Sequence, residues 1–277
     1  MDTQLRTNTI TLPQAIIYFT VIQAMWMILG SRITAELFSL VKHPSLITTY
    51  LMLHVNFVFL LLILVLFIYH IHRSSITSYV TDAVTFRYKL MFISMGVWIT
   101  VTTLVVFVLF LIDPNVITLH KSSHQYSFIF TLIILILTPL QAIAEELLFR
   151  TTLWRLLQSH IKKGYLLCCI SAVLFAVAHL SNFEVQHNKG VTLLYYSFVG
   201  FLFMYLTIQS RGSEIAFGFH IANNLLVALV FTYPNSSLQA QAIFILNKAY
   251  PLLDILILIT ASYILNRINT LFSSKKG

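Results

Sequence analysis

The sequence predicts an all-α fold, a polytopic transmembrane helical bundle of about eight spans, and three observations lead to this prediction. Hydrophobic residues make up 58% of the 277 residues and charged residues only 9%, whereas soluble domains average about 25% charged residues. Apolar runs of the ~20 residues that a spanning helix needs recur along the whole chain. No internal repeat, low-complexity tract or linker separates them, so residues 1–277 are expected to form a single integral membrane domain.

Eight apolar segments are expected to be the membrane spans. The first is interpreted as a retained span, because its apolar stretch is at the upper length limit for a signal peptide and lacks a small-residue cleavage site. The adjacent Cys168 and Cys169 cannot reach each other in disulfide geometry and are interpreted as packing residues. The expected spans run approximately over Pro13–Gly30, Leu46–Tyr69, Leu90–Ile112, Tyr126–Phe149, Tyr165–Leu180, Val191–Ile208, Ile215–Phe231 and Pro251–Leu265.

Lys and Arg residues are distributed unevenly between the two sets of loops. Eleven fall in the N-terminus, the C-terminus and the connections after the second, fourth and sixth spans, and five fall in the alternate loops. The positive-inside rule therefore predicts a multi-pass protein of the cell membrane with both termini cytoplasmic. Because the net charge of +8 resides in short loops, the lipid bilayer is the expected partner and no nucleic acid is expected.

The fourth span ends with three ionisable residues, in the sequence LIILILTPLQAIAEELLFR. Each charge at mid-span costs roughly 2.5–3.5 kcal/mol on translocon scales, so the group needs partners. Glu146 and Arg150 are four residues apart on one helix face, in the favourable order for an ion pair. Glu145 points about 100° away from that pair and is expected to face a cavity. A salt bridge that only joins helices is the alternative interpretation.

Two further spans carry polar residues one helical turn apart. The fifth contains Phe175 and His179 and the seventh contains His220 and Asn224, and each pair shares a helix face. A single intramembrane His is often only a hydrogen-bonding group between helices. Two His, one Asn and the Glu-Glu-Arg group on three spans instead predict a shared polar pocket.

The other acidic and His residues are expected to be interfacial or isolated, because they fall at span edges or in loops. For Glu214 and Asp254, helix capping and a position beside a cavity both remain open. The residues expected at interfacial or isolated positions are Glu36, Asp82, Asp113, Glu184, His43, His54, His70, His72, His120, His124, His160 and His187.

The predicted pocket has the groups needed to hydrolyse a peptide bond. A carboxylate beside a second carboxylate in a low dielectric gains proton affinity, which suits Glu145 as a general base for water. His179 would position the water or the substrate carbonyl, and His220 with Asn224 would donate to the oxyanion. Glu145, His179 and His220 could instead bind a divalent metal such as zinc. The sequence lacks the His-Glu-x-x-His zinc-protease motif, and no cofactor is favoured.

The ordered motifs Glu145-Glu146-x-x-x-Arg150, Phe175-x-x-x-His179 and His220-x-x-x-Asn224 resemble those of the CPBP family. This family, also called Abi, includes the eukaryotic CAAX prenyl endopeptidase and bacterial proteins tied to bacteriocin processing and self-immunity. The resemblance covers roughly 126–231, which is expected to hold the catalytic core. It implies that Glu145 activates water and that His179, His220 and Asn224 complete the catalytic site. Glu146 and Arg150 would support them.

The sequence thus favours an intramembrane endopeptidase of the CPBP type that cuts a membrane-delivered peptide or protein tail. The family has been described both as metalloproteases and as glutamate proteases, and the second description is favoured here. For a bacterial chain, a pheromone or bacteriocin precursor is a more plausible substrate than a prenylated tail. The alternatives are a non-proteolytic scaffold or bacteriocin self-immunity protein with the same fold, and a transporter with a proton relay.

Overall fold

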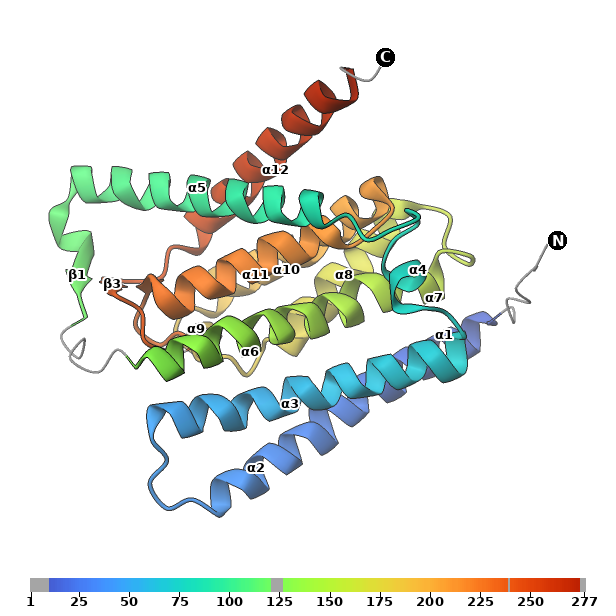
Figure 1. The fold of residues 1–277 in the computed structure, drawn as a ribbon, viewed down its shortest axis with the longest axis horizontal. Helices are drawn as coiled ribbons and strands as arrows, with labels where there is room; N and C mark the ends of the chain where they lie inside the picture. Colours follow the sequence, from blue (N-terminus) through green and yellow to red (C-terminus); the bar gives the residue numbers. More distant parts are fainter. Residues whose placement is uncertain (1–9, 121–126, 239, 275–277) are drawn as a thin grey trace.

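The computed structural model describes residues 10–120, 127–238 and 240–274, and it confirms the all-α prediction. Long helices lie side by side and are joined by short connections at the two ends of the bundle (Figure 1). Among the described residues, six helical stretches are long and apolar enough to cross a membrane. The chain is therefore a multi-pass membrane protein.

The first two spans form an antiparallel pair at one edge of the bundle (Figure 1). The first runs without interruption through α1 (Leu12–Ala24), the π-helical turn η1 (Met25–Gly30) and α2 (Ser31–Ser39). The second comprises α3 (Leu46–Leu66) and the π-helical turn η2 (Phe67–His72). The Ser45 hydroxyl starts α3 by accepting a hydrogen bond from the Thr48 amide, which satisfies one of the free N–H groups at the helix start.

The third and fourth spans bring the Glu-Glu-Arg sequence into the centre of the bundle. The third span is α5 (Tyr88–Ile112), and the fourth comprises α6 (Phe128–Glu146), the π-helical turn η5 (Leu147–Thr152) and α7 (Leu153–Leu157). The π-helical turn begins directly after the two glutamates, and such turns are frequent at functional sites.

The remaining long helices close the bundle around α6. They are α8 (Gly164–Ala178), α10 (Lys189–Ser210), α11 (Glu214–Leu229) and α12 (Pro251–Ser274). Gly200 on α10 lets α8 approach closely, because a Cβ atom there would lie 2.7 Å from the Ala172 Cα atom and 2.8 Å from the Ser171 carbonyl oxygen. A larger residue at this position would separate the two helices.

The two ends of the bundle are held by different contacts. At one end α4 (Ile76–Val80) and the following loop are fixed by an ion pair of 2.8 Å between Arg155 and Asp82. At the other end η3 (Pro114–Val116) leads into a small sheet of order β1-β3-β2. Its strand β1 (Ile117–Leu119) pairs antiparallel with β3 (Phe244–Leu246), which pairs parallel with β2 (Phe231–Thr232). The short helix α9 (Phe183–His187) lies at the same end.

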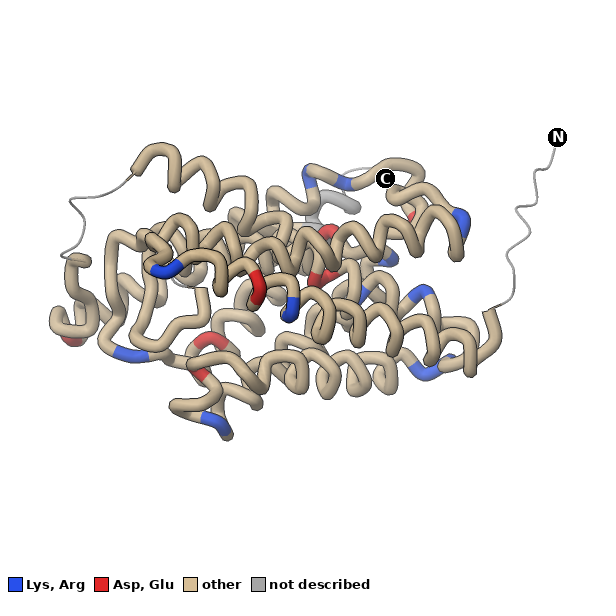
Figure 2. The backbone as a smooth tube through the Cα atoms, turned by 90° about the horizontal axis from the view of Figure 1, so that it is seen from below, with Lys and Arg blue, Asp and Glu red and all other residues tan. Residues whose placement is uncertain are grey.

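Lys and Arg residues are more numerous toward the end of the bundle that carries α4 and α7 (right in Figure 2). The loops that the sequence shows to be rich in Lys and Arg therefore gather toward one end of the bundle.

Among the described residues, six of the eight expected spans are long enough to cross a membrane and two are shorter. All eight are apolar helices, but α8 and α11, with 15 and 16 residues, are shorter than the other six. At 1.5 Å per residue such a helix is about 23 Å long, less than the ~30 Å hydrocarbon core of a bilayer. These two shorter helices carry Phe175 and the His220-Asn224 pair into the protein interior.

Candidate active site

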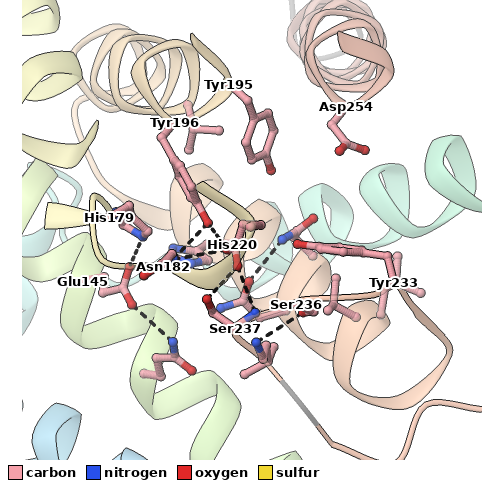
Figure 3. Close-up of a pocket in the computed structure, with 18 of the residues that line it drawn as sticks. Glu145, His179, Asn182, Tyr195, Tyr196, His220, Tyr233, Ser236, Ser237 and Asp254 are labelled. Atoms are coloured by element: carbon pink, nitrogen blue, oxygen red, sulfur yellow. Dashed lines mark hydrogen bonds and ion pairs between the residues drawn. The ribbon is translucent and has the colours of Figure 1, made fainter. Parts of the chain in front are cut away.

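Four of the six predicted site residues line one cavity of about 530 Å³ inside the bundle; they are Glu145, His179, His220 and Asn224. Glu145 comes from α6, His179 follows the last residue of α8, and the other two lie on α11. The three motifs, separated along the chain, therefore meet at one site. Figure 3 shows this cavity from within.

Glu146 and Arg150 lie behind the cavity wall and form the predicted ion pair, with 3.1 Å between Arg150 Nε and Glu146 Oε2. Both side chains are fully buried. The guanidinium also donates to the Val199 carbonyl oxygen at 3.4 Å and lies 4.1 Å from the centre of the Phe175 ring. Contacts from three helices thus stabilise the positive charge of Arg150, which would otherwise be energetically unfavourable in a low dielectric.

His220 is fixed by the same carboxylate. Its Nδ1 atom lies 2.7 Å from Glu146 Oε1. Because the Glu146 carboxylate is paired with Arg150, this oxygen accepts and His220 Nδ1 donates. In the neutral imidazole, Nε2 is then the unprotonated nitrogen, and it faces the cavity beside Glu145.

His179 has the same tautomer for a different reason. Its Nδ1 atom lies 2.7 Å from the Phe175 carbonyl oxygen, which can only accept, so Nδ1 donates. The Tyr196 ring stacks on the imidazole with the ring centres 4.1 Å apart, and so holds its plane. Nε2 of His179 is thereby left as an acceptor that points at Glu145 (Figure 3).

Three acceptor atoms therefore converge at one point of the cavity. Glu145 Oε2 lies 3.7 Å from His179 Nε2 and 4.0 Å from His220 Nε2, and it has no hydrogen-bond partner. The other oxygen, Oε1, accepts a bond of 3.3 Å from the Gln141 amide. Glu145 is only 3% exposed, so this arrangement requires a proton donor or a cation between the three atoms.

Asn224 lines the cavity together with His220, but the tautomer inferred for His220 leaves only Asn224 as a hydrogen-bond donor. Its Oδ1 atom accepts from the Asn223 side chain at 3.1 Å, which leaves its Nδ2 group as a donor. His220 Nε2 carries no proton in the resting tautomer, so Asn224 is the donor of the two.

The zinc alternative can be compared with these distances. Tetrahedral zinc with bonds of about 2.0–2.2 Å keeps its ligand atoms about 3.3–3.6 Å apart. The separations of 3.7 and 4.0 Å from Glu145 to the two His are longer. Among the described residues no group of three or more His, Cys, Asp and Glu side chains is arranged to hold a metal ion. As placed, Glu145 lies farther from the two His than zinc ligands lie from one another.

Two residues expected at interfacial or isolated positions lie in the interior instead. His54 is 3% exposed and lines the cavity from α3, where its Nδ1 atom bonds the Tyr50 carbonyl oxygen. Glu184 is 8% exposed and accepts four hydrogen bonds, two of them from Ser237. The expectation was wrong for both. The loop that contains Ser237 folds over α9 and supplies the distant donors of Glu184, and His54 is buried because α3 packs against α6.

Glu214 and Asp254, for which two interpretations were open, differ in role. Glu214 is buried at the start of α11 and is paired with Arg87 at 2.7 Å. Burial alone would raise the pKa of Glu214, but the charge of Arg87 and the hydrogen bonds to the carboxylate, from Arg87 first, together hold the pKa below its usual value. Asp254 lines the cavity from α12. Gln141 and Tyr196, which orient Glu145 and His179, carry no motif that marks them in the sequence.

Comparisons with known proteins found a relative and a family model that match part of this chain. Over 102 residues the chain is 36% identical to the uncharacterized protein YyaK of Bacillus subtilis (strain 168), and the alignment covers 37% of this chain and 34% of that protein. The chain thus matches about a third of the length of this curated relative. No solved structure matches the chain. Residues 126–226 match the family model described as type II CAAX prenyl endopeptidase Rce1-like. This segment contains all six site residues, and through it the chain is similar to the Rce1-like type II CAAX prenyl endopeptidases.

Proposed function

We propose that the protein is an intramembrane endopeptidase in which Glu145 activates water. The convergence of Glu145 Oε2 with the two unprotonated Nε2 atoms carries this proposal. A water molecule placed between them donates one hydrogen to the carboxylate and the other to an imidazole, and its lone pair then faces the cavity. The carboxylate and one imidazole thereby orient the nucleophile before the substrate binds.

The reaction needs no groups beyond those in the cavity wall. Glu145 takes a proton as the water oxygen attacks the substrate carbonyl carbon. The resulting oxyanion accepts a hydrogen bond from Asn224 Nδ2. The C–N bond then breaks, and the protonated Glu145 returns its proton to the leaving amine. Water and one peptide bond are consumed, and a carboxylic acid and an amine are formed.

Glu146 and Arg150 are positioning residues in this scheme. Glu146 fixes the tautomer of His220 through the bond of 2.7 Å, and Arg150 forms the ion pair that balances the charge of Glu146. Because Arg150 satisfies the charge of Glu146, Glu145 is the carboxylate left to exchange protons. The mechanism is proposed to be metal-independent.

The substrate is proposed to be a peptide or protein tail that enters from the cytoplasmic leaflet of the cell membrane, with both termini of the enzyme on the cytoplasmic side. We propose a peptide pheromone or bacteriocin precursor, and not a prenylated tail, as this substrate. The proposal rests on the family match and on the polar cavity inside an apolar bundle.

The test is proteolysis by the full chain purified into nanodiscs, with internally quenched apolar peptides as probes. Wild type should cleave them and Glu145→Gln should not, since the amide keeps the shape of the side chain but cannot accept the proton. Glu36→Gln, on the exposed face of α2, is the matched control and should remain active. Equal cleavage by Glu145→Gln and wild type would overturn the mechanism. A non-proteolytic scaffold instead predicts that Glu145→Gln keeps full cellular function.

A further inference from the structure

The cavity has an unbalanced set of charges. Its lining contains three carboxylates, Glu145, Glu184 and Asp254, and none of the described residues that line it is Lys or Arg. The carboxylate of Glu184 is satisfied, because Tyr196, Asn182 and Ser237 donate to it. Glu145 has an oxygen without a hydrogen-bond partner and Asp254 is the third acid. The cavity is therefore complementary to positive charge.

Asp254 is the carboxylate that the hydrolytic scheme does not use. It is the fourth residue of α12 and lies within a candidate membrane span. Its backbone amide bonds the Tyr250 carbonyl oxygen, but no described residue forms an ion pair or hydrogen bond with its carboxylate. An acidic residue at such a position is costly to the fold and commonly marks a binding path.

Two tyrosines accompany Asp254 on the cavity wall. Tyr195 from α10 and Tyr233 from the loop after β2 project toward the same space as the Asp254 side chain (Figure 3). Burial raises the pKa of Tyr233, and the nearby carboxylates of Glu184 and Asp254 raise it further. The phenols therefore stay neutral, and their ring faces attract cations.

We propose that Asp254, Tyr195 and Tyr233 form a subsite for a cationic group of the substrate, either the side chain of Lys or Arg or a free N-terminal ammonium. The inference rests on the proposed function in that the occupant is a peptide. Glu145 and Asp254 line one continuous cavity, so a peptide whose carbonyl group lies at Glu145 extends toward Asp254. The subsite selects peptides that carry a positive charge at one side of the cleaved bond.

Binding is the readout, because it separates this inference from the hydrolytic proposal. Full-length Glu145→Gln protein, which does not consume peptide, is placed in nanodiscs of zwitterionic lipid so that lipid charge does not attract the probes. Fluorescent apolar peptides serve as probes in three forms. The first form is N-acetylated and carries a single Lys, whose position in the sequence is varied. The second form is N-acetylated and has norleucine in place of Lys, so it carries no positive charge. The third form has norleucine and a free N-terminal amine.

The Lys or free-amine form should bind about tenfold more tightly than the acetylated norleucine form, since a desolvated ion pair forms only with the charged probes. The added Asp254→Asn change should abolish this preference. Asp113→Asn, in the exposed loop after α5, is the control and should keep it. Which of the two charged forms is preferred identifies a side chain or the N-terminus as the occupant.

Equal binding of charged and uncharged peptides would overturn the subsite, and this comparison does not depend on whether Asp254→Asn folds. A preference that persists in folded Asp254→Asn would also overturn it. Cleavage of the same peptides by protein with Glu145 intact is scored separately. Selective binding without cleavage would refute the hydrolytic function and leave the subsite intact. Cleavage without selective binding would refute the subsite and leave the hydrolytic function intact.

Discussion

His220 Nδ1 lies 2.7 Å from Glu146 Oε1, so the imidazole is held by the buried carboxylate and not by the one that faces the cavity. The two adjacent glutamates therefore have separate tasks. Glu146 has its charge balanced by Arg150 and directs the ring, while Glu145 keeps one oxygen available in the cavity.

Loss of Arg150 should impair folding more than loss of Glu145. Arg150→Ala leaves Glu146 buried without its cation, and breaking such a pair costs about 3–5 kcal/mol. Arg150→Ala should therefore reduce the yield of monodisperse protein and its melting temperature, whereas Glu145→Gln should behave as wild type. Arg32→Ala, on an exposed position of α2, controls for the loss of one positive charge. Equal yields of Arg150→Ala and Glu145→Gln would contradict the structural role of the pair.

Peptide cleavage should survive removal of metal ions. The purified protein is assayed before and after exhaustive treatment with a zinc chelator, and the rate should not change, because the proposed steps use only side chains and water. Loss of activity that stoichiometric zinc restores would falsify the glutamate mechanism and make His179 and His220 metal ligands.

Asn224→Ala should lower kcat by about 10²–10³-fold with little change in KM, as expected when one oxyanion donor is removed. The control is Asn188→Ala, because Asn188 is exposed beside α10. A mainly raised KM would instead assign Asn224 to substrate binding.

Gly200→Ala should destabilise the protein by about 1–3 kcal/mol, because the added methyl group meets backbone atoms of α8. Gly96 in α5 is a matched control, since a Cβ atom there has nothing within 4 Å. Gly96→Ala should be neutral or stabilising by up to about 1 kcal/mol. Thermal unfolding of both variants in the same detergent measures the difference. Equal melting temperatures would show that α8 and α10 can separate without cost.

The orientation can be tested with single cysteines in a background that lacks Cys168 and Cys169. Ser75 and Asn188 are exposed at opposite ends of the bundle. An impermeant thiol reagent added to intact cells should label Asn188→Cys and leave Ser75→Cys unlabelled, because the end that carries α4 is richer in Lys and Arg. The opposite labelling pattern would invert the proposed topology.

Several features of the site were predictable because they depend on helix geometry. The spacing of Glu146 and Arg150 determines their ion pair, and membrane spans leave few places for polar residues other than a shared interior. Glu184 was not predictable in this way, because its partner Ser237 lies 53 residues away in a loop without helical periodicity. The role of His54 was hidden for the same reason, as it depends on how α3 packs against α6.

The ion pair within one helix has a consequence for biogenesis. Arg150 finds its carboxylate on its own helix, so the fourth span can leave the translocon with this ion pair already formed, before any later helix has been made. His220, in contrast, comes 74 residues after Glu146 and joins it only when α11 has inserted. A nascent chain that has reached α10 therefore carries Glu145 and His179 but not His220, and the three side chains can converge only after the seventh apolar helix is in place.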